Sequence, residues 1–469
     1  MFRLSLKEIW RGRIHWFSFL AATTLVAFII YLAVLYSWST ETRIAELLAQ
    51  YGERPVRRLR GFASSAVWIY GVPSVVMLSM VLKAMSTRLA PAFRLLRFAG
   101  ATSRQLCLVM LVQVLAIGAA ACLVGGAAAA ATSPLVFSLV NVLTLTPGLA
   151  PTQFLATSGT FLVIMAGLLV LAAARPLVRI ARMSPVVSKP HAEIQRPGLG
   201  RKIFGALALI ALVAALAFPA MIALRDAGLA GLDPGDKLVS GLSQFGYLTM
   251  LVVLCCLGAW HRSWHGMLLA GLQRLVRWAG WLVACRNVRA RLSMTSAIVL
   301  PSTVALGAVF VTWSMNRSVT KVKNAYPNVA AYLDSLGQFF LFMVPLLIVV
   351  VICSLAILVI SDGELRRGIS VLRSAGVSRS GLLLSGTSEA VVLTVLIAAT
   401  TVAIVVLSTV SGLVYTAVAG LGVHWVQFGW GELFVAFAGL FLLFGCFYLV
   451  MVLASLRRPL PEEFRSVAS

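Results

Sequence analysis

Charge is scarce in this chain, and acidic charge is the scarcest. Only 12% of its 469 residues are charged, against about a quarter in ordinary soluble domains, whereas 60% are hydrophobic. This composition excludes a soluble globular protein and makes a lipid bilayer the expected solvent. Apolar runs of about 20 residues, enough for a helix to cross about 30 Å of hydrocarbon, predict an all-α integral membrane protein with about ten transmembrane helices. They lie at 15–36, 63–84, 105–132, 152–174, 203–224, 243–261, 293–315, 337–360, 382–410 and 431–454.

The few charges are distributed unevenly. Fifteen acidic residues stand against 39 Lys and Arg, for a net charge of +24. With the N-terminus in the cytoplasm, 28 of the basic residues are cytoplasmic, ten are external and Lys83 lies at a span end. This split obeys the positive-inside rule. It predicts a multi-pass protein of the inner (plasma) membrane with both termini cytoplasmic and the first run kept as an uncleaved anchor. Segment 175–202 carries seven basic residues and one acid, so we expect membrane lipids, and not nucleic acid, as partners.

Several chemical motifs are absent from the sequence. No Gly-x4-Gly-Lys-Ser/Thr phosphate loop occurs, so the chain is not expected to be an enzyme that hydrolyses ATP. The seven cysteines include no CxxC pair and indicate neither a disulfide framework nor a zinc site. His261 and His265 have the spacing of two metal ligands on a helix, but the neighbouring Trp260 and Trp264 favour an interfacial aromatic belt. We therefore predict no catalytic residue, no metal and no cofactor in this chain.

One motif occurs twice. The segment Leu96-Arg97-x-Ala99-Gly100-x-Thr102 returns 276 residues later as Leu372-Arg373-x-Ala375-Gly376-x-Ser378, and the same offset carries Gln113 onto Glu389. Each copy lies in a group of four apolar runs, and two further runs separate the groups. Because two intervening spans preserve orientation, the repeat is predicted to be parallel. The expected domains are a first module at 1–190, two linker helices with an amphipathic interfacial segment at 191–279, and a second module at 280–469.

Each copy of the motif predicts a sharp turn between two helices, which we call the first elbow (residues 91–104) and the second elbow (residues 367–380). Gly100 suits the left-handed position after a helix end, and Thr102 with Gln105 forms a capping box for the next helix. In the second elbow Gly381 stands where the equivalent of Gln105 would be, so that cap should be weaker. The elbows either present basic, amphipathic helices to the groove of a soluble partner or only fix the topology through their charge.

These features resemble the FtsX-like, MacB-type permease family of ABC transporters. The resemblance rests on Leu-Arg-x-x-Gly-x-Ser/Thr before a long helix, on Glu389, and on the basic segments 286–291 and 175–185. The arrangement of four, two and four spans is similar to BceB-type members, but the large extracellular domain of the family is missing and Gln113 replaces the usual Glu. The resemblance implies that a cytoplasmic ABC ATPase, with its ATP and Mg, binds this chain in two copies. These two copies would contact both elbows. The residues expected to couple to it are Arg94, Leu96, Arg97, Gly100, Thr102, Arg104, Arg367, Leu372, Arg373, Gly376, Ser378 and Glu389.

Three other features complete the expectations. The outer basic residues Arg54, Arg57, Arg58, Arg60, Arg317, Lys321 and Lys323 are candidates for contact with an anionic lipid or cargo, or simply with outer headgroups. Glu389, near the cytoplasmic end of a span, is expected to form an interfacial hydrogen bond or ion pair, with a proton path as the less favoured alternative. The small-residue run 119–131 is expected to pack between the two modules.

The function expected from these observations is a permease subunit that exports or extracts a hydrophobic or amphipathic cargo, such as a lipid, an antimicrobial peptide or a drug. Two alternatives fit the same sequence. One is a signalling module of the same fold that controls a cell-wall hydrolase or a sensor kinase, and the other is an autonomous secondary transporter. The scarcity of ionisable residues inside the spans weighs against the secondary transporter.

Overall fold

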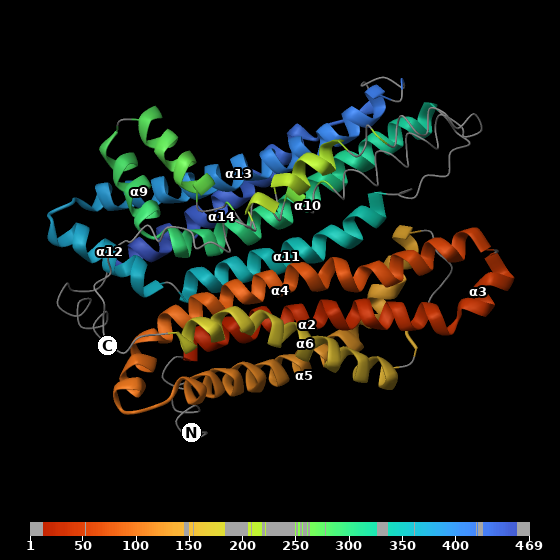
Figure 1. The fold of residues 1–469 in the computed structure, drawn as a ribbon, viewed down its shortest axis with the longest axis horizontal. Coiled ribbons are helices and arrows are strands. Elements are labelled where there is room, and N and C mark those ends of the chain that lie inside the picture. The colour runs from red at the N-terminus through yellow and green to blue at the C-terminus, as the bar shows by residue number, and fades with distance from the viewer. Residues whose placement is uncertain are drawn as a thin grey trace. The chain divides into compact units, whose positions relative to one another are not determined.

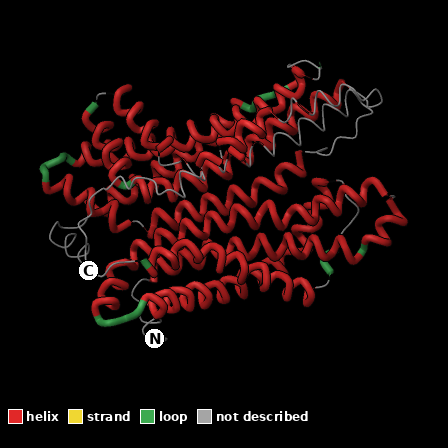
Figure 2. Tube along the Cα trace, in the orientation of Figure 1, coloured by secondary structure: helices red, strands yellow, loops and turns green. Residues whose placement is uncertain are grey.

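The computed structural model describes most of the chain, and all regular structure in the described residues is helical (Figure 2). The described ranges are 13–51, 53–144, 150–152, 154–182, 205–207, 209–217, 263–276, 278–325, 336–360, 362–418 and 425–456, with isolated residues between 221 and 260 and at 420. The prediction of an all-α protein is therefore confirmed for these residues. The two linker runs, 203–224 and 243–261, lie largely outside them.

The principal helices are labelled in Figure 1. They are α2 (Arg13–Thr42), α3 (Ile44–Tyr51), α4 (Glu53–Phe98), α5 (Ser103–Thr144), α6 (Phe154–Ala181), α9 (Ala279–Ala290), α10 (Leu292–Ala325), α11 (Leu336–Ile360), α12 (Asp362–Ser374), α13 (Arg379–Val418) and α14 (Trp430–Leu456).

Seven of these helices are long and apolar enough to cross a membrane, by length and composition: α2, α4, α5, α6, α10, α13 and α14. They match seven of the ten predicted runs and are consistent with a transmembrane protein. The run at 337–360 corresponds to α11, whose described apolar stretch is the shorter Leu347–Ile360, and the run at 203–224 is represented by Gly205–Ala217. The count of ten spans, the topology and the position of the termini stay predictions.

The longest helices extend well beyond their apolar runs. Helix α4 has 46 residues, α5 has 42 and α13 has 40, which at 1.5 Å per residue is about 60–70 Å, twice the hydrocarbon thickness. Because each of these helices begins or ends at an elbow, the elbows are joined to the spans by uninterrupted helix.

The first compact unit comprises residues 1–191 and 335–361. In it α2 packs against α4, α5, α6 and α11, and α11 also contacts α4 and α5 (Figure 1). A Cβ atom at Gly125 of α5 would lie 2.5 Å from the Thr24 carbonyl oxygen of α2, so only glycine permits this approach. The expectation that the small-residue run packs between modules is thus wrong for Gly125, because its close neighbour is α2 of its own unit.

The second compact unit comprises residues 192–334 and 362–469. Helix α13 is its centre, in contact with α9, α10, α12 and α14, and its buried residues run along most of its length. Gly307 of α10 and Gly386 of α13 mark close helix approaches, to Ile404 and to Val452 respectively. These units are groups of packed helices and are defined differently from the sequence repeats, because α11 lies in the first unit. The three-part division at 190 and 279 stays a prediction.

Candidate functional site: two elbows and a buried carboxylate

The first elbow ends α4 with a Schellman turn. Gly100 has a φ of +93°, its N–H donates to the Arg97 carbonyl at 3.1 Å, and the Ala101 N–H donates to the Leu96 carbonyl at 3.0 Å. These two bonds satisfy carbonyls that a helix end otherwise leaves without a partner. No atom lies within 4 Å of a Cβ built on Gly100, so glycine is required here for its backbone angle and not for space.

The second elbow has the same backbone turn at the end of α12. Gly376 has a φ of +82°, and its N–H donates to the Arg373 carbonyl at 3.0 Å, while the Val377 N–H donates to the Leu372 carbonyl at 3.1 Å. The helix stop predicted from each glycine is therefore confirmed, down to the equivalent pair of hydrogen bonds.

The two elbows differ in the cap of the following helix. In the first, the Thr102 N–H donates to Gln105 Oε1 at 2.9 Å and the Gln105 N–H donates to Thr102 Oγ1 at 3.3 Å, a complete capping box. Arg97 Nη2 also donates to Ser103 Oγ at 2.9 Å across the turn. In the second, the Gly381 N–H donates to Ser378 Oγ at 3.2 Å, and glycine has no side chain to return a bond. The predicted weaker second cap is confirmed.

Both elbows expose apolar side chains beside basic ones. Leu95 and Phe98 of the first elbow are 70% and 64% exposed, and Val371 of the second is 53% exposed. Arg94, Leu96, Arg97, Leu372 and Arg373 are half-buried, whereas Gly100, Thr102, Arg104, Gly376 and Ser378 are exposed. The side chain of Arg367 lies outside the described residues. A short helix with exposed apolar and cationic groups has the character of a protein docking surface.

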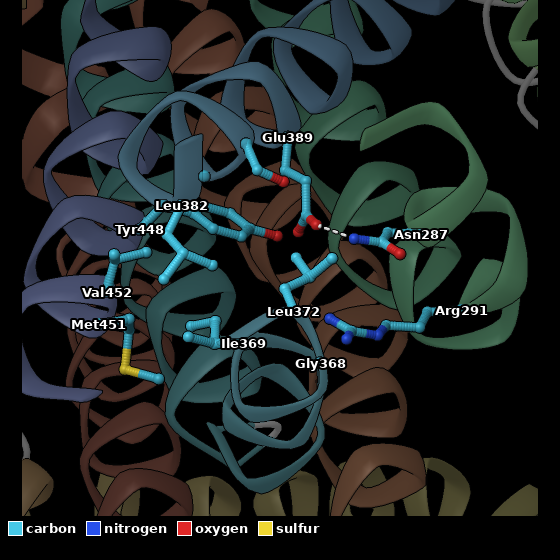
Figure 3. A pocket seen from close by; sticks show the side chains of 12 residues that line it. Asn287, Arg291, Gly368, Ile369, Leu372, Leu382, Glu389, Tyr448, Met451 and Val452 are labelled. Atoms are coloured by element: carbon cyan, nitrogen blue, oxygen red, sulfur yellow. Dashed lines mark hydrogen bonds between the residues drawn. The ribbon is translucent and has the colours of Figure 1, made fainter. Parts of the chain in front are cut away.

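Glu389 of α13 is buried within the second unit, near the second elbow (Figure 3). Asn287 Nδ2 donates to its Oε1 at 2.8 Å. The Tyr448 hydroxyl of α14 also hydrogen-bonds to this carboxylate, and Arg291 acts on it electrostatically. We call Glu389, Asn287, Arg291 and Tyr448 the carboxylate cluster. The expected interfacial hydrogen bond of Glu389 is thereby observed, and a compensating positive charge is what a buried carboxylate requires.

The carboxylate cluster is in contact with the elbow helix α12. Gly368 and Leu372 of α12 line the same small cavity as the cluster residues (Figure 3), and a Cβ at Gly368 would overlap the Arg291 guanidinium. The cavity is of water-molecule size, far below the several hundred Å³ of a small-molecule site. The cluster therefore joins α9, α12, α13 and α14 and does not form a ligand pocket.

The first unit carries an amide at the equivalent position. Gln113 of α5 is 1% exposed, and the 276-residue offset places Ala172 where Tyr448 stands in the second copy. An uncharged side chain needs no buried counter-charge. The two repeats therefore share the elbow backbone but differ at the equivalent buried position, which holds an amide in the first and a carboxylate with a nearby arginine in the second.

Of the basic residues predicted to lie outside, those whose side chains are described belong to the second unit. Arg317 of α10 forms an ion pair with Glu432 of α14, and its guanidinium carbon lies 5.4 Å from the ring centre of Trp313. Lys321 is half-buried. The side chains of Arg54, Arg57, Arg58, Arg60 and Lys323 lie outside the described residues. Because Glu432 already compensates the charge of Arg317, this residue is a weaker anion ligand than the sequence alone indicates.

No group of three metal-ligating side chains occurs among the described residues; His265 is buried and His261 lies outside them. Burial raises the pKa of the Cys285 thiol, two residues before Asn287, which makes its reactive thiolate form less available.

Sequence reasoning identified both elbow glycines, Glu389 and the basic segment that holds Asn287 and Arg291. It missed Tyr448 and Gly368. Tyr448 lies in an apolar run with several other aromatic residues, and one glycine in a basic helix gives no sign of the guanidinium beside it.

Comparisons with known proteins add no further assignment. No known protein-family model matches the chain, and no curated protein matches it.

Proposed function

We propose that this chain is the permease subunit of an ABC transporter, made of two fused FtsX-like modules, which moves a hydrophobic or amphipathic cargo. The observation that carries the proposal is the duplicated elbow, which has the same pair of helix-ending hydrogen bonds in both copies. If the two turns served only to place positive charge, they would not need to share the same pair of helix-ending hydrogen bonds.

The elbows are suited to receive force from another protein. The first elbow is rigid because a complete capping box and the Arg97 to Ser103 bond close it. It is continuous with α4 and α5, so a displacement of the turn moves both long helices. In this proposal two cytoplasmic ATPase subunits, with their ATP and Mg, bind the elbows and shift the spans between two packed states when they close.

Cargo enters from the bilayer in this proposal. The two cavities described beside Glu389 in the second unit are of water-molecule size, so neither of them is a chamber for a cargo. Helix surfaces such as those of α5 and α6 expose large apolar side chains, and a hydrophobic cargo can reach them through the lipid.

The second candidate is an FtsX-like signalling module for a wall hydrolase or sensor kinase, which the exposed side chains of the two elbows would serve equally well. In that case the same elbows transmit force without cargo. Stimulation of ATPase activity by an amphipathic peptide or drug supports the permease; co-purification with a kinase and no such stimulation supports the signalling module.

The elbows can be tested by charge reversal. Arg97→Glu combined with Arg373→Glu should abolish co-purification of an ATPase encoded beside this chain, or reduce its coupled activity in nanodiscs more than tenfold. The matched control is Arg274→Glu combined with Arg286→Glu, which reverses two exposed charges outside the elbows and should leave binding unchanged. Normal coupling by the elbow variant would refute the docking role.

A further inference from the structure

We infer that the elbow end of the first unit holds a binding site for the phosphate of an anionic phospholipid, formed by Thr87 and Arg88 of α4 with Arg175, Arg179 and Arg182 at the end of α6. We call these five residues the basic collar. Arg179 Nη1 donates to Thr87 Oγ1 at 3.0 Å, so the last turns of α6 lie directly beside α4. This inference needs only that the helices cross a membrane and is independent of the proposed transport function.

All five collar residues are exposed, and the described residues place no carboxylate in an ion pair with any of the four arginines. Acids are also absent from the sequence between Glu53 and Glu193. Positive charge therefore accumulates at this end of the unit, without a carboxylate partner among the described residues. One phosphate with two or three guanidinium donors is the complementary ligand.

The arginines continue a face of α6 that points to lipid. Val163, Val170 and Leu171 are 74%, 49% and 64% exposed, as expected for side chains in contact with acyl chains. Arg175 follows Leu171 by four residues, and Arg182 follows Arg175 by seven, so both lie on the same stripe of the helix. The stripe thus changes from apolar to cationic along one line, as a phospholipid changes from acyl chain to headgroup.

The depth of the collar separates it from the elbow. Measured from the predicted apolar run 152–174, Arg175, Arg179 and Arg182 lie about 2, 8 and 12 Å out at 1.5 Å per residue, and Arg88 lies about 6 Å beyond the predicted run 63–84. The headgroup layer is about 5–8 Å thick on each side. Measured from the predicted run 63–84, Gly100 lies about 24 Å out, further than any residue of the collar. The collar residues thus lie nearest to the predicted spans, where a lipid phosphate is the available anion, and the elbow variant below serves as the charge-matched comparison.

The test compares binding of phosphatidylglycerol and phosphatidylcholine with the same acyl chains to the detergent-solubilised full chain, by native mass spectrometry. The variant is Arg175→Gln, Arg179→Gln and Arg182→Gln together, and the control removes three charges from the elbow, with Arg94→Gln, Arg97→Gln and Arg104→Gln. Each arginine near a membrane surface contributes about fivefold to anionic lipid affinity. The collar variant should therefore bind phosphatidylglycerol about a hundredfold more weakly, and the elbow variant should bind it within about twofold of the natural chain.

Equal loss in both variants would show a general charge effect and overturn the inference, as would unchanged binding by the collar variant. Phosphatidylglycerol must also stay bound in millimolar inorganic phosphate; its displacement would replace the lipid site by a free phosphate site. A collar variant that keeps its lipid but loses a co-expressed ATPase would assign these arginines to protein docking. Replacement of the three arginines by lysine serves as the folding control and should keep most of the preference.

Discussion

Removal of the Glu389 carboxylate tests whether the carboxylate cluster supports the second elbow. Glu389→Ala deletes the acceptor of the Asn287 and Tyr448 hydrogen bonds and leaves Arg291 without its counter-charge. Glu389→Gln keeps the size and one oxygen that can accept from Asn287, but it removes the charge and replaces the second acceptor oxygen by an NH2 group. Gln113→Ala in the first repeat is the matched control, because it deletes a buried polar side chain that has no charge.

The expected magnitude follows from burial. Breaking a fully buried ion pair costs about 3–5 kcal/mol, but Arg291 is half-buried and can turn toward water, so about 2–4 kcal/mol is expected for Glu389→Ala. The amide variant should cost about 1–3 kcal/mol, as for a lost hydrogen bond to a charged group. Gln113→Ala should cost no more than about 2 kcal/mol.

The assay is reversible unfolding in mixed micelles, run as a double-mutant cycle with Arg291→Ala. Because each single variant leaves an unpaired charge, the double variant should be less destabilised than the sum of the two, with a coupling of about 1–3 kcal/mol. Additivity within about 0.5 kcal/mol would refute the cluster as an energetic unit. Equal effects of Glu389→Ala and Gln113→Ala would refute the role of charge.

Two further predictions concern glycines. Gly100→Ala should destabilise the protein by about 1–2 kcal/mol because it forces a side chain into the left-handed region. Gly159→Ala lies in the interior of α6 with open space at its Cβ and should stabilise the protein by about 0.5–1 kcal/mol. A lower thermal midpoint for both variants would contradict the backbone argument. Gly125→Val should cost about 3 kcal/mol or more because its side chain would overlap the α2 backbone, and an unchanged thermal midpoint would show that α2 and α5 can separate without cost.

The parts of the fold that local chemistry determines could be predicted from the sequence. The φ of Gly100 and the capping box of Thr102 follow from residues within one turn of each other, so sequence reasoning reaches individual hydrogen bonds there. The positions of the long helices follow from apolar runs of membrane length. Their ends do not, because α4 begins at Glu53, ten residues before its apolar run, and hydropathy gives no sign of that extension.

Contacts between distant segments could not be predicted in this way. The apolar run of α11 is similar in composition to its neighbours in sequence, yet α11 packs in the first unit. Which helix receives it depends on the fit of two surfaces, and no periodicity in α11 itself encodes that fit. The same limit applies to Tyr448, which reaches Glu389 from a helix about 60 residues further along the chain.

The two elbows share a backbone but depend on different interactions. The first is held by its own residues, through a complete capping box and the bond from Arg97 to Ser103. The second has half of that cap, and its helix α12 lies against the Arg291 guanidinium through Gly368. Its geometry therefore depends on α9, α13 and α14, which meet at Glu389. A force applied equally to both elbows would move the first as one rigid piece with α4 and α5, whereas at the second it would act on a buried charge cluster whose rearrangement costs energy. If the elbows transmit force as proposed, the two would respond unequally, and the difference between Gln113 and Glu389 at equivalent positions of the repeat is the sequence feature that marks this.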